Sequence, residues 1–334
     1  MQAPNRPKVL VARKIFDSTL NKLREHFDVE VNSEDVPWSR AELSTRAQGC
    51  WGVLTTGSER IDEAFFASVP KLQAVCNMAV GYNNIDVAAA RAVGVVCTNT
   101  PDVLTQTTAD FGFALLMATA RRMTEAERYL RSGLWSQWSY DMMMGADVHG
   151  STLGILGMGR IGQAIAKRAA FGFDMRVLYH NRSRLDANTE QSCAAEYVTK
   201  AELLAQADHL MIVVPYSASS HHAIGAEELR SMKRSATLIN IARGGVVDDA
   251  ALAQALAAGD IAAAGLDVFE GEPKVHPDLL ALDNVVLTPH IASASLKTRL
   301  AMADLAADNL IALHTSGQAL TPVPEGLQGL EPRA

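Results

Sequence analysis

Three polar residues that together could bind and protonate a small acid each follow a predicted strand: Arg243, Glu272 and His290. The planar guanidinium of Arg243 can grip a carboxylate and polarise an adjacent carbonyl. His290 can supply a proton near neutral pH, and a carboxylate such as Glu272 beside it favours the imidazolium form. Each residue alone would more often be a surface or turn residue. Because the carboxyl ends of neighbouring parallel strands share one edge of a sheet, the three together predict an acid–base site.

A glycine-rich turn upstream indicates a dinucleotide as the partner for that chemistry. An apolar stretch at 152–156 leads into the run 157–162 (Gly-Met-Gly-Arg-Ile-Gly), and apolar residues at helical spacing follow. In such a strand–turn–helix unit the first glycine permits the turn and the second lets the backbone approach a pyrophosphate. The third allows close helix packing. The diphosphate is expected at the positive N-terminus of the helix.

The end of the next predicted strand indicates which dinucleotide binds. An NAD site usually places an Asp or Glu about 20 residues after the glycine turn, where it holds the ribose 2′-hydroxyl. Here the strand at 175–179 is followed by His-Asn-Arg-Ser-Arg, and Asp174 and Asp186 lie outside the strand end. Arg182 and Arg184 suit the oxygens of a 2′-phosphate. We therefore expect NADP(H) in preference to NAD(H), the alternative being a solvated basic turn.

The composition fits an ordinary globular protein of 334 residues, 48% hydrophobic and 20% charged, with room for two domains. The net charge of −7 argues against a nucleic-acid partner. No apolar run reaches the ~18 residues of a membrane span, and the N-terminus does not resemble a signal peptide. The four cysteines lack the spacing of a zinc site, so we expect no metal, buried thiols and a cytoplasmic location.

The order of predicted elements indicates an α/β fold with two Rossmann-like parallel-sheet domains. We expect a flavodoxin-like substrate-binding domain at 1–102 and 289–334, with an NADP-binding Rossmann domain inserted at 103–288. Two long helices, at 105–121 and 295–315, would connect the domains as a hinge over a cleft. The expected strands lie at 9–12, 29–31, 52–55, 72–76, 95–98, 152–156, 175–179, 210–214, 237–241, 263–267 and 285–287.

These segments resemble the D-isomer-specific 2-hydroxyacid dehydrogenase family over nearly the whole chain, and most closely its glyoxylate/hydroxypyruvate reductase and 2-ketogluconate reductase branch. The resemblance implies that Arg243 binds the substrate carboxylate and carbonyl, that His290 is the acid and base, and that Glu272 supports His290. The combination is far more specific than a glycine turn alone. The resembling segments are 99–103, 107–110, 154–162, 240–245, 265–273 and 289–293.

The resemblance also implies contacts that spacing does not predict. The backbone N–H groups of Val80 and Gly81 would bind the substrate carboxylate, and Asp267 would face the nicotinamide amide. Members of this branch are dimers in which the aromatic loop matching 133–140 reaches the partner's active site. Trp138 is then a substrate-shaping residue in trans, or alternatively a plain aromatic of the dimer core.

The expected cofactor contacts combine the glycine turn, the basic strand end and the positions that match the family. They are Val80, Thr108, Gly157, Met158, Gly159, Arg160, Ile161, Gly162, Asn181, Arg182, Ser183, Arg184, Val214, Pro215, Ile241, Ala242, Arg243, Asp267, His290, Ala292 and Ser293. Among them Ala292 departs from the family, which often has glycine there.

We therefore expect an NADPH-dependent oxidoreductase that reduces small 2-keto acids to D-2-hydroxy acids, with His290 as proton donor and a homodimeric assembly. Glyoxylate and hydroxypyruvate are the expected substrates, with 2-keto-D-gluconate close behind. One alternative is an NAD(P)-sensing, co-repressor-type binding protein without significant turnover. Another is an NAD-linked dehydrogenase such as that for phosphoglycerate. The three catalytic residues argue against the first alternative, and the basic strand end argues against the second.

Overall fold

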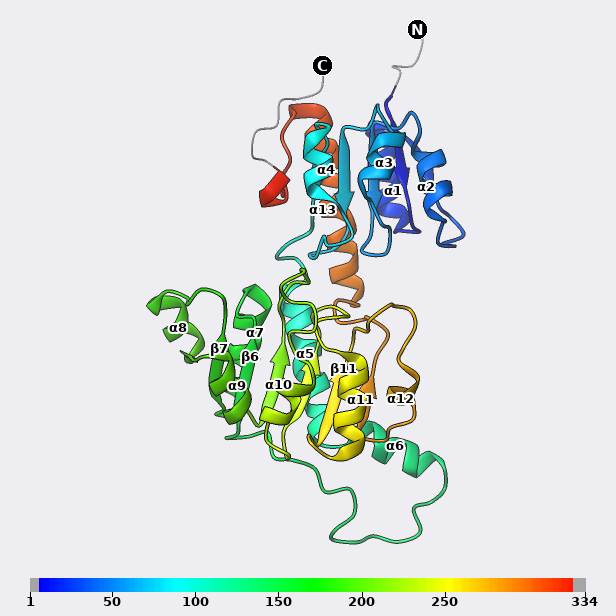
Figure 1. The fold of residues 1–334 in the computed structure, drawn as a ribbon. Coiled ribbons are helices and arrows are strands. Elements are labelled where there is room, and N and C mark those ends of the chain that lie inside the picture. Colours follow the sequence, from blue (N-terminus) through cyan, green and yellow to red (C-terminus); the bar gives the residue numbers. More distant parts are fainter. Residues whose placement is uncertain (1–5, 327–334) are drawn as a thin grey trace. The chain divides into compact units, whose positions relative to one another are not determined.

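The computed structural model describes residues 6–326, which divide into two compact α/β units (Figure 1). The first unit combines the segment that ends at Leu104 with the segment that begins at Ser295, and the second is Thr105–Ala294. The second boundary falls later than the one expected at 288, so His290 belongs to the second unit. Among the described residues, no helix combines the length and apolar character needed to cross a membrane.

The first unit is built on a parallel sheet with strand order β2-β1-β3-β4-β5, which is the flavodoxin-like order that we expected. The order reverses between β1 and β3, and β4 leads directly into the loop at 78–84. Its strands are β1 (Lys8–Val11), β2 (Asp28–Val31), β3 (Gly52–Thr55), β4 (Ala74–Asn77) and β5 (Val96–Thr98). Its helices are α1 (Asp17–His26), α2 (Arg40–Ala47), α3 (Glu63–Ser68), α4 (Val87–Ala92), α13 (Leu296–Ser316) and the short 3-10 helix η1 (Pro324–Gly326).

The second unit carries a seven-stranded parallel sheet of order β12-β11-β10-β9-β6-β7-β8. This is the doubly wound order of a Rossmann domain, reversing between β6 and β9, where such folds bind their ligands. Its strands are β6 (Thr152–Leu156), β7 (Arg176–His180), β8 (Ala195–Tyr197), β9 (His209–Ile212), β10 (Thr237–Asn240), β11 (Ala263–Leu266) and β12 (Val285–Leu287). Its helices are α5 (Thr105–Ala120), α6 (Met123–Arg131), α7 (Arg160–Phe173), α8 (Ala187–Cys193), α9 (Lys200–Gln206), α10 (Ala226–Ser231), α11 (Asp249–Ala258) and α12 (Pro277–Leu280).

Several inner strands of the two sheets are buried at every position. This holds for β3 and β4 in the first unit and for β9, β10 and β11 in the second. Parallel strands covered by helices on both faces lose the alternation of apolar and polar residues, which is why these segments read as short continuous apolar runs. The two expected parallel sheets are thereby confirmed.

Helix α5 packs against the second sheet where small residues allow a close approach. A Cβ at Gly112 would lie 2.7 Å from the side chain of Ile241, and one at Gly265 would lie 2.4 Å from that of Thr119. Because Ile241 directly follows β10, the N-terminal turns of α5 lie toward the carboxyl ends of the strands. That placement brings Thr108, on the turn before Gly112, to the edge of the sheet where the cofactor is expected.

Helices α2 and α6 and the edge strand β8 are among the elements that the hydrophobic pattern did not indicate. Helix α2 is polar over most of its length and begins at Ser39, whose hydroxyl accepts from the N–H of Glu42. Helix α6 has no buried residue, and β8 is a three-residue strand at the sheet edge. Short elements that bury little of their surface leave only a weak periodic signal.

Candidate active site

The side chain of His290 pairs with Glu272 at the carboxyl edge of the second sheet. Nδ1 of His290 lies 2.8 Å from Oε2 of Glu272, while Oε1 of Glu272 accepts from the N–H of Phe269 at 3.0 Å. Burial raises the pKa of Glu272, but the hydrogen bond and charge of His290 outweigh it, so the pKa lies below its ordinary value. The carboxylate therefore stays charged and fixes the imidazole ring, leaving Nε2 available for proton transfer.

Asp267 holds the turn that presents His290. Its carboxylate accepts from the Thr288 hydroxyl at 2.8 Å and from the N–H groups of Ile291 and Ala292, each at 2.9 Å. Burial raises the pKa of Asp267, and those hydrogen bonds oppose the rise. Asp267 is 0% exposed, so its role within the chain is to hold this turn. The expected contact with a nicotinamide amide stays a prediction. The sequence placed this acid at the correct strand end, but it could not show that the carboxylate turns inward.

Arg243 lies on a turn that packs closely against the segment carrying Glu272. The Asn240 side chain accepts from the N–H of Ala242 at 3.0 Å and shapes this turn. At Gly244 a Cβ would lie 1.7 Å from the carbonyl oxygen of Phe269, so only glycine fits. Burial lowers the pKa of Arg243, opposed by the charge of Glu272, yet a guanidinium stays protonated in proteins. The structure thus brings together all three predicted residues of the acid–base site.

Asp249 is a further positioning residue that the sequence pattern did not reveal. It lies in the first turn of α11 and is 5% exposed. Its carboxylate accepts from the N–H of Glu270 at 2.9 Å, which fixes the segment leading to Glu272. The sequence offered only an acidic pair, Asp248 and Asp249, at a helix start, a pattern more typical of a simple N-cap.

The glycine turn has the three features that a dinucleotide requires. Gly157 has φ of +103°, and a Cβ there would lie 2.8 Å from the Val214 backbone. At Gly162 a Cβ would lie 2.4 Å from the Gly157 carbonyl, so the third glycine allows close packing of α7. At Gly159 the equivalent space is open, which leaves room for a diphosphate. The N-terminus of α7 begins there without a side-chain cap.

Two further contacts shape this turn and its surroundings. The Asn181 side chain accepts from the N–H of Met158 at 2.7 Å, so Asn181 fixes the turn, in addition to any cofactor contact. The buried hydroxyl of Thr108 has no hydrogen-bond partner among the described residues. A buried orphan hydroxyl is uncommon in proteins, and one at this sheet edge fits a polar ligand group. The residues present therefore suit a dinucleotide.

The basic strand end is more constrained than the sequence suggested. Arg184 donates from Nε and Nη2 to the two carboxylate oxygens of Glu190, each at 2.8 Å, and the Tyr179 hydroxyl donates to the same carboxylate. These hydrogen bonds lower the pKa of Glu190. Arg182 is exposed and forms no ion pair with any residue of the described chain. Arg184 is thus paired within the chain, whereas Arg182 is not, and the binding of a 2′-phosphate by these two arginines stays a prediction.

The loop after β4 in the first unit exposes two backbone donors. Asn99 donates to the Val80 carbonyl at 2.8 Å, and Asn77 donates to the Gly81 carbonyl at 3.1 Å. The N–H groups of Val80 and Gly81 donate to no group in residues 6–326. Because these hydrogen bonds fix the two carbonyl groups, the adjacent N–H groups of Val80 and Gly81 form a small anion-binding surface. The asparagines that build it were not identified from the sequence.

The remaining predicted contacts take varied positions. Trp138 lies on the loop after α6, 65% exposed, with its ring 4.6 Å from that of Tyr140. It is not brought to His290 by any described contact within one chain. Met158, Ile241, Ala242 and Ala292 are buried, whereas Ile161, Val214 and Ser293 are partly buried and Arg160, Ser183 and Pro215 are exposed.

Sequence comparison identifies the family to which this chain is similar. Residues 113–292 match the family described as "D-isomer specific 2-hydroxyacid dehydrogenase, NAD binding domain". Glyoxylate reductase of Thermococcus onnurineus is 50% identical over 311 residues, covering 92% of each chain. Glyoxylate reductase of Korarchaeum cryptofilum is 49% identical over 310 residues, with the same coverage.

The chain is also similar to solved structures of proteins from other organisms. The NADPH-dependent glyoxylate/hydroxypyruvate reductase of Sinorhizobium meliloti, in complex with NADP and malonate, is 38% identical with a TM-score of 0.88. The match covers 98% of this chain and 99% of that one. A Thermus thermophilus protein, TT0316, is 41% identical with a TM-score of 0.88 over 95% of this chain and 99% of its own.

Proposed function

We propose a reaction for this chain from one premise: it belongs to the D-isomer specific 2-hydroxyacid dehydrogenase family and is an oxidoreductase acting on 2-hydroxy acids. The reaction is the NADPH-dependent reduction of a small 2-keto acid, with glyoxylate first and hydroxypyruvate next, to the 2-hydroxy acid, which has the D configuration where the product is chiral. The observation that carries the proposal is the His290–Glu272 pair beside the Arg243 turn. The relatives named glyoxylate reductase support the choice of substrate.

The substrate is held by its carboxylate. The free N–H groups of Val80 and Gly81 suit one carboxylate edge, and the guanidinium of Arg243 suits the other together with the keto oxygen. A charge-assisted pair of this kind fixes the plane of a 2-keto acid and polarises its carbonyl. Positioning by these groups predicts a preference for substrates with a carboxylate next to the carbonyl.

The proton comes from His290. Its Nδ1 is committed to Glu272, so Nε2 delivers the proton to the keto oxygen as the carbonyl is reduced. When bound, the nicotinamide supplies the hydride for the carbonyl carbon. The Glu272 carboxylate keeps the ring oriented before and after the transfer.

NADPH is the proposed cofactor because an acid is absent from the β7 end and Arg182 is uncommitted there. The relative of known structure from Sinorhizobium meliloti is NADPH-dependent. A second candidate is an enzyme that also accepts NADH. The ion pair between Arg184 and Glu190 favours this candidate, because it engages one of the two arginines expected to bind the phosphate.

We also propose that the chain acts as a homodimer in the cytoplasm. The four buried free cysteines fit a reducing compartment. Helix α6 and the loop after it expose a set of large apolar side chains, which is typical of an interface. These residues are Met123, Leu130, Leu134, Trp135, Trp138, Tyr140 and Met144.

A substrate series tests the proposed specificity. Initial rates with NADPH should rank glyoxylate and hydroxypyruvate above pyruvate, with 2-keto-D-gluconate reduced if the site admits longer chains. Activity confined to a substrate without a 2-keto acid group would contradict the roles given to Arg243, Val80 and Gly81. Tight NADPH binding without turnover of any keto acid would instead favour a binding protein.

A further inference from the structure

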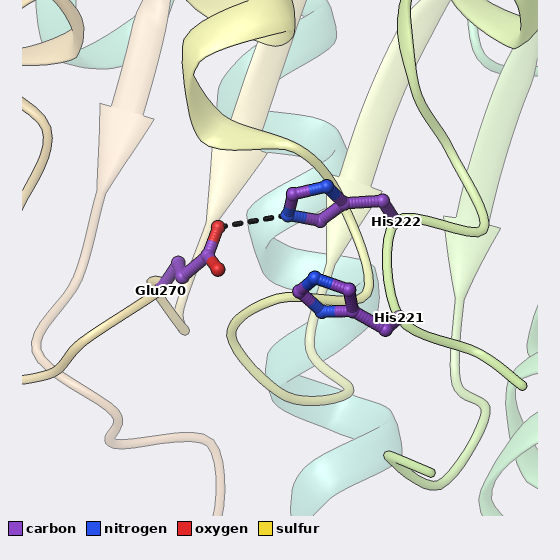
Figure 2. Close-up of side chains that lie close together, drawn as sticks. All are labelled: His221, His222 and Glu270. Carbon is purple, nitrogen blue, oxygen red and sulfur yellow. Dashed lines mark hydrogen bonds and ion pairs between the residues drawn. The ribbon is translucent and has the colours of Figure 1, made fainter. Parts of the chain in front are cut away.

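We propose that His221, His222 and Glu270 form a binding site for one divalent transition-metal ion of the Zn²⁺ type. The two histidines follow β9 on the loop before α10, and Glu270 follows β11. Figure 2 shows both imidazole rings turned toward the Glu270 carboxylate. The proposed reduction uses none of these three side chains, so their grouping requires another explanation.

The geometry of the cluster is close to that of a metal site. One ligand atom from each of the three residues lies within 4.8 Å of the others, and Nε2 of His222 is 3.0 Å from Oε2 of Glu270. In a tetrahedral zinc site with bonds of about 2.0–2.1 Å, ligand atoms are roughly 3.4 Å apart. Small side-chain rotations therefore bring all three ligands around one ion. Two imidazoles and one carboxylate are a ligand set that suits Zn²⁺ and leaves a fourth position for water.

The backbone holds the cluster in place. His222 has φ of +49°, an uncommon conformation for a residue other than glycine, and its N–H donates to the Gly245 carbonyl at 2.8 Å. The imidazole rings of the two histidines stack with centroids 3.8 Å apart. On the opposite side, Asp249 fixes the backbone of Glu270. Ligands held on restrained backbone lose little entropy when an ion binds.

Gly245 borders the space between the ligands. A Cβ there would lie 3.4 Å from Nδ1 of His221 and 3.9 Å from Oε1 of Glu270, with the Tyr216 ring at 3.1 Å. The absence of a side chain at Gly245 therefore keeps the centre of the cluster clear. This glycine stands two residues after Arg243, and Glu270 stands two residues before Glu272.

A second carboxylate supports His222 as a ligand. Oδ2 of Asp248 lies 3.7 Å from Nδ1 of His222, on the ring nitrogen away from Glu270. Metal-binding histidines usually direct their other ring nitrogen to a carboxylate, which orients the ring and raises its basicity. Asp248 is itself held by capping α11, where its carboxylate accepts from the N–H of Ala251 at 3.0 Å. Nδ1 of His221 lies 3.2 Å from the Tyr216 hydroxyl, which orients the second imidazole.

An ion at this site would join the loop before α10 to the segment that carries Glu272. The ion is expected to raise the midpoint of thermal unfolding, because a ligand that binds only the folded state stabilises it. It is not required for the reduction itself, since Arg243, Glu272 and His290 make no use of it.

The test is calorimetric titration of the untagged chain with ZnCl₂, with the thermal midpoint measured in parallel. We expect one ion per chain and a Zn²⁺-dependent rise in the midpoint. The His221→Gln, His222→Gln double variant should lose both, and Asp248→Asn should weaken affinity about 10–100-fold. His149→Gln is the matched control, because His149 also pairs with a carboxylate, Asp174 at 3.2 Å, without a third ligand in the cluster.

Co²⁺ provides a second readout. Visible absorption typical of nitrogen and oxygen coordination should appear in the wild type and in His149→Gln, and should be lost in the double variant. Zn²⁺ binding of equal stoichiometry and affinity in wild type and double variant would overturn the proposal, as would no binding in the wild type. Circular dichroism and NADPH binding of each variant show whether it remains folded.

Discussion

Nδ1 of His290 lies 2.8 Å from Oε2 of Glu272, although the two residues come from the ends of different strands. Separate supports hold each partner. Asp267 fixes the turn of His290, while the N–H of Phe269 and the carboxylate of Asp249 fix the segment of Glu272. A proton donor held from both sides needs little rearrangement when a substrate binds.

Replacing His290 by Gln should remove the proton donor while leaving the cofactor in place. We expect kcat for glyoxylate reduction to fall about 10²–10⁴-fold. NADPH affinity, measured by fluorescence titration, should change less than about threefold. His149→Gln, on an exposed His–Asp pair of the same unit, is the control and should retain wild-type activity. Retained turnover in His290→Gln would assign the proton to another group.

Replacing Glu272 by Gln should lower the rate of reduction without unfolding the chain. The carboxylate orients the His290 ring through Nδ1, so without its charge-assisted hydrogen bond the proton donor is held less firmly and kcat for glyoxylate should fall about tenfold or more. Glu42→Gln, which removes an exposed carboxylate paired with Arg46, serves as the control. A kcat equal to that of the wild type would show that Glu272 does not position His290.

The same carboxylate predicts the direction of acid sensitivity. The pKa of Glu272 lies below its ordinary value of 4.5, held down by His290 against the opposing effect of burial. Its stabilising contribution is therefore present above about pH 4.5 and is lost as pH falls through the lower folded value. Thermal midpoints of the wild type and Glu272→Gln should differ at pH 6 and converge as the pH falls below 4.5. A difference that grows with acidification would contradict this sign.

Replacing each of the two arginines after β7 by alanine should have a different effect. Arg182→Ala should weaken NADPH binding about tenfold or more, as expected for a lost charge-assisted bond to phosphate, and leave NADH binding unchanged. Arg184→Ala should chiefly affect stability, because Arg184 is held by Glu190. Steady-state KM values for both cofactors measure the difference. An equal loss with NADH in Arg182→Ala would show that Arg182 does not recognise the 2′-phosphate.

Two glycines of the turn should fail in different ways when replaced by alanine. Gly162→Ala places a Cβ 2.4 Å from the Gly157 carbonyl and should destabilise the fold by about 1–3 kcal/mol. At Gly159 a Cβ meets open space, so Gly159→Ala should keep the thermal midpoint and weaken NADPH binding about tenfold or more. Unchanged cofactor affinity in Gly159→Ala would place the diphosphate elsewhere.

Much of the fold could be predicted from the sequence because its strong signals are local. Buried parallel strands appear as short apolar runs, and the glycine turn marks the start of α7, so the expected strands lie close to those observed. The hydrophobic pattern did not indicate short polar elements such as α2 and α6, because they bury few apolar side chains.

The site was predicted less completely because side-chain direction depends on tertiary contacts. The spacing located Arg243, Glu272 and His290, but not the supports that hold them. Arg184 pairs with Glu190, on a helix that begins past the strand end, a partner that no local motif indicates. Asn77 and Asn99 act on the loop after β4 from the ends of two strands, and only the sheet brings them together.

The most direct test of the central claim compares initial rates of glyoxylate reduction with NADPH and with NADH. We predict turnover with a kcat/KM at least about tenfold higher for NADPH, which corresponds to ~1.4 kcal/mol. A preference for NADH would contradict the role of Arg182 and the choice of cofactor. Absence of turnover with glyoxylate, hydroxypyruvate or any other 2-keto acid, in a chain that binds NADPH, would contradict the proposed reaction.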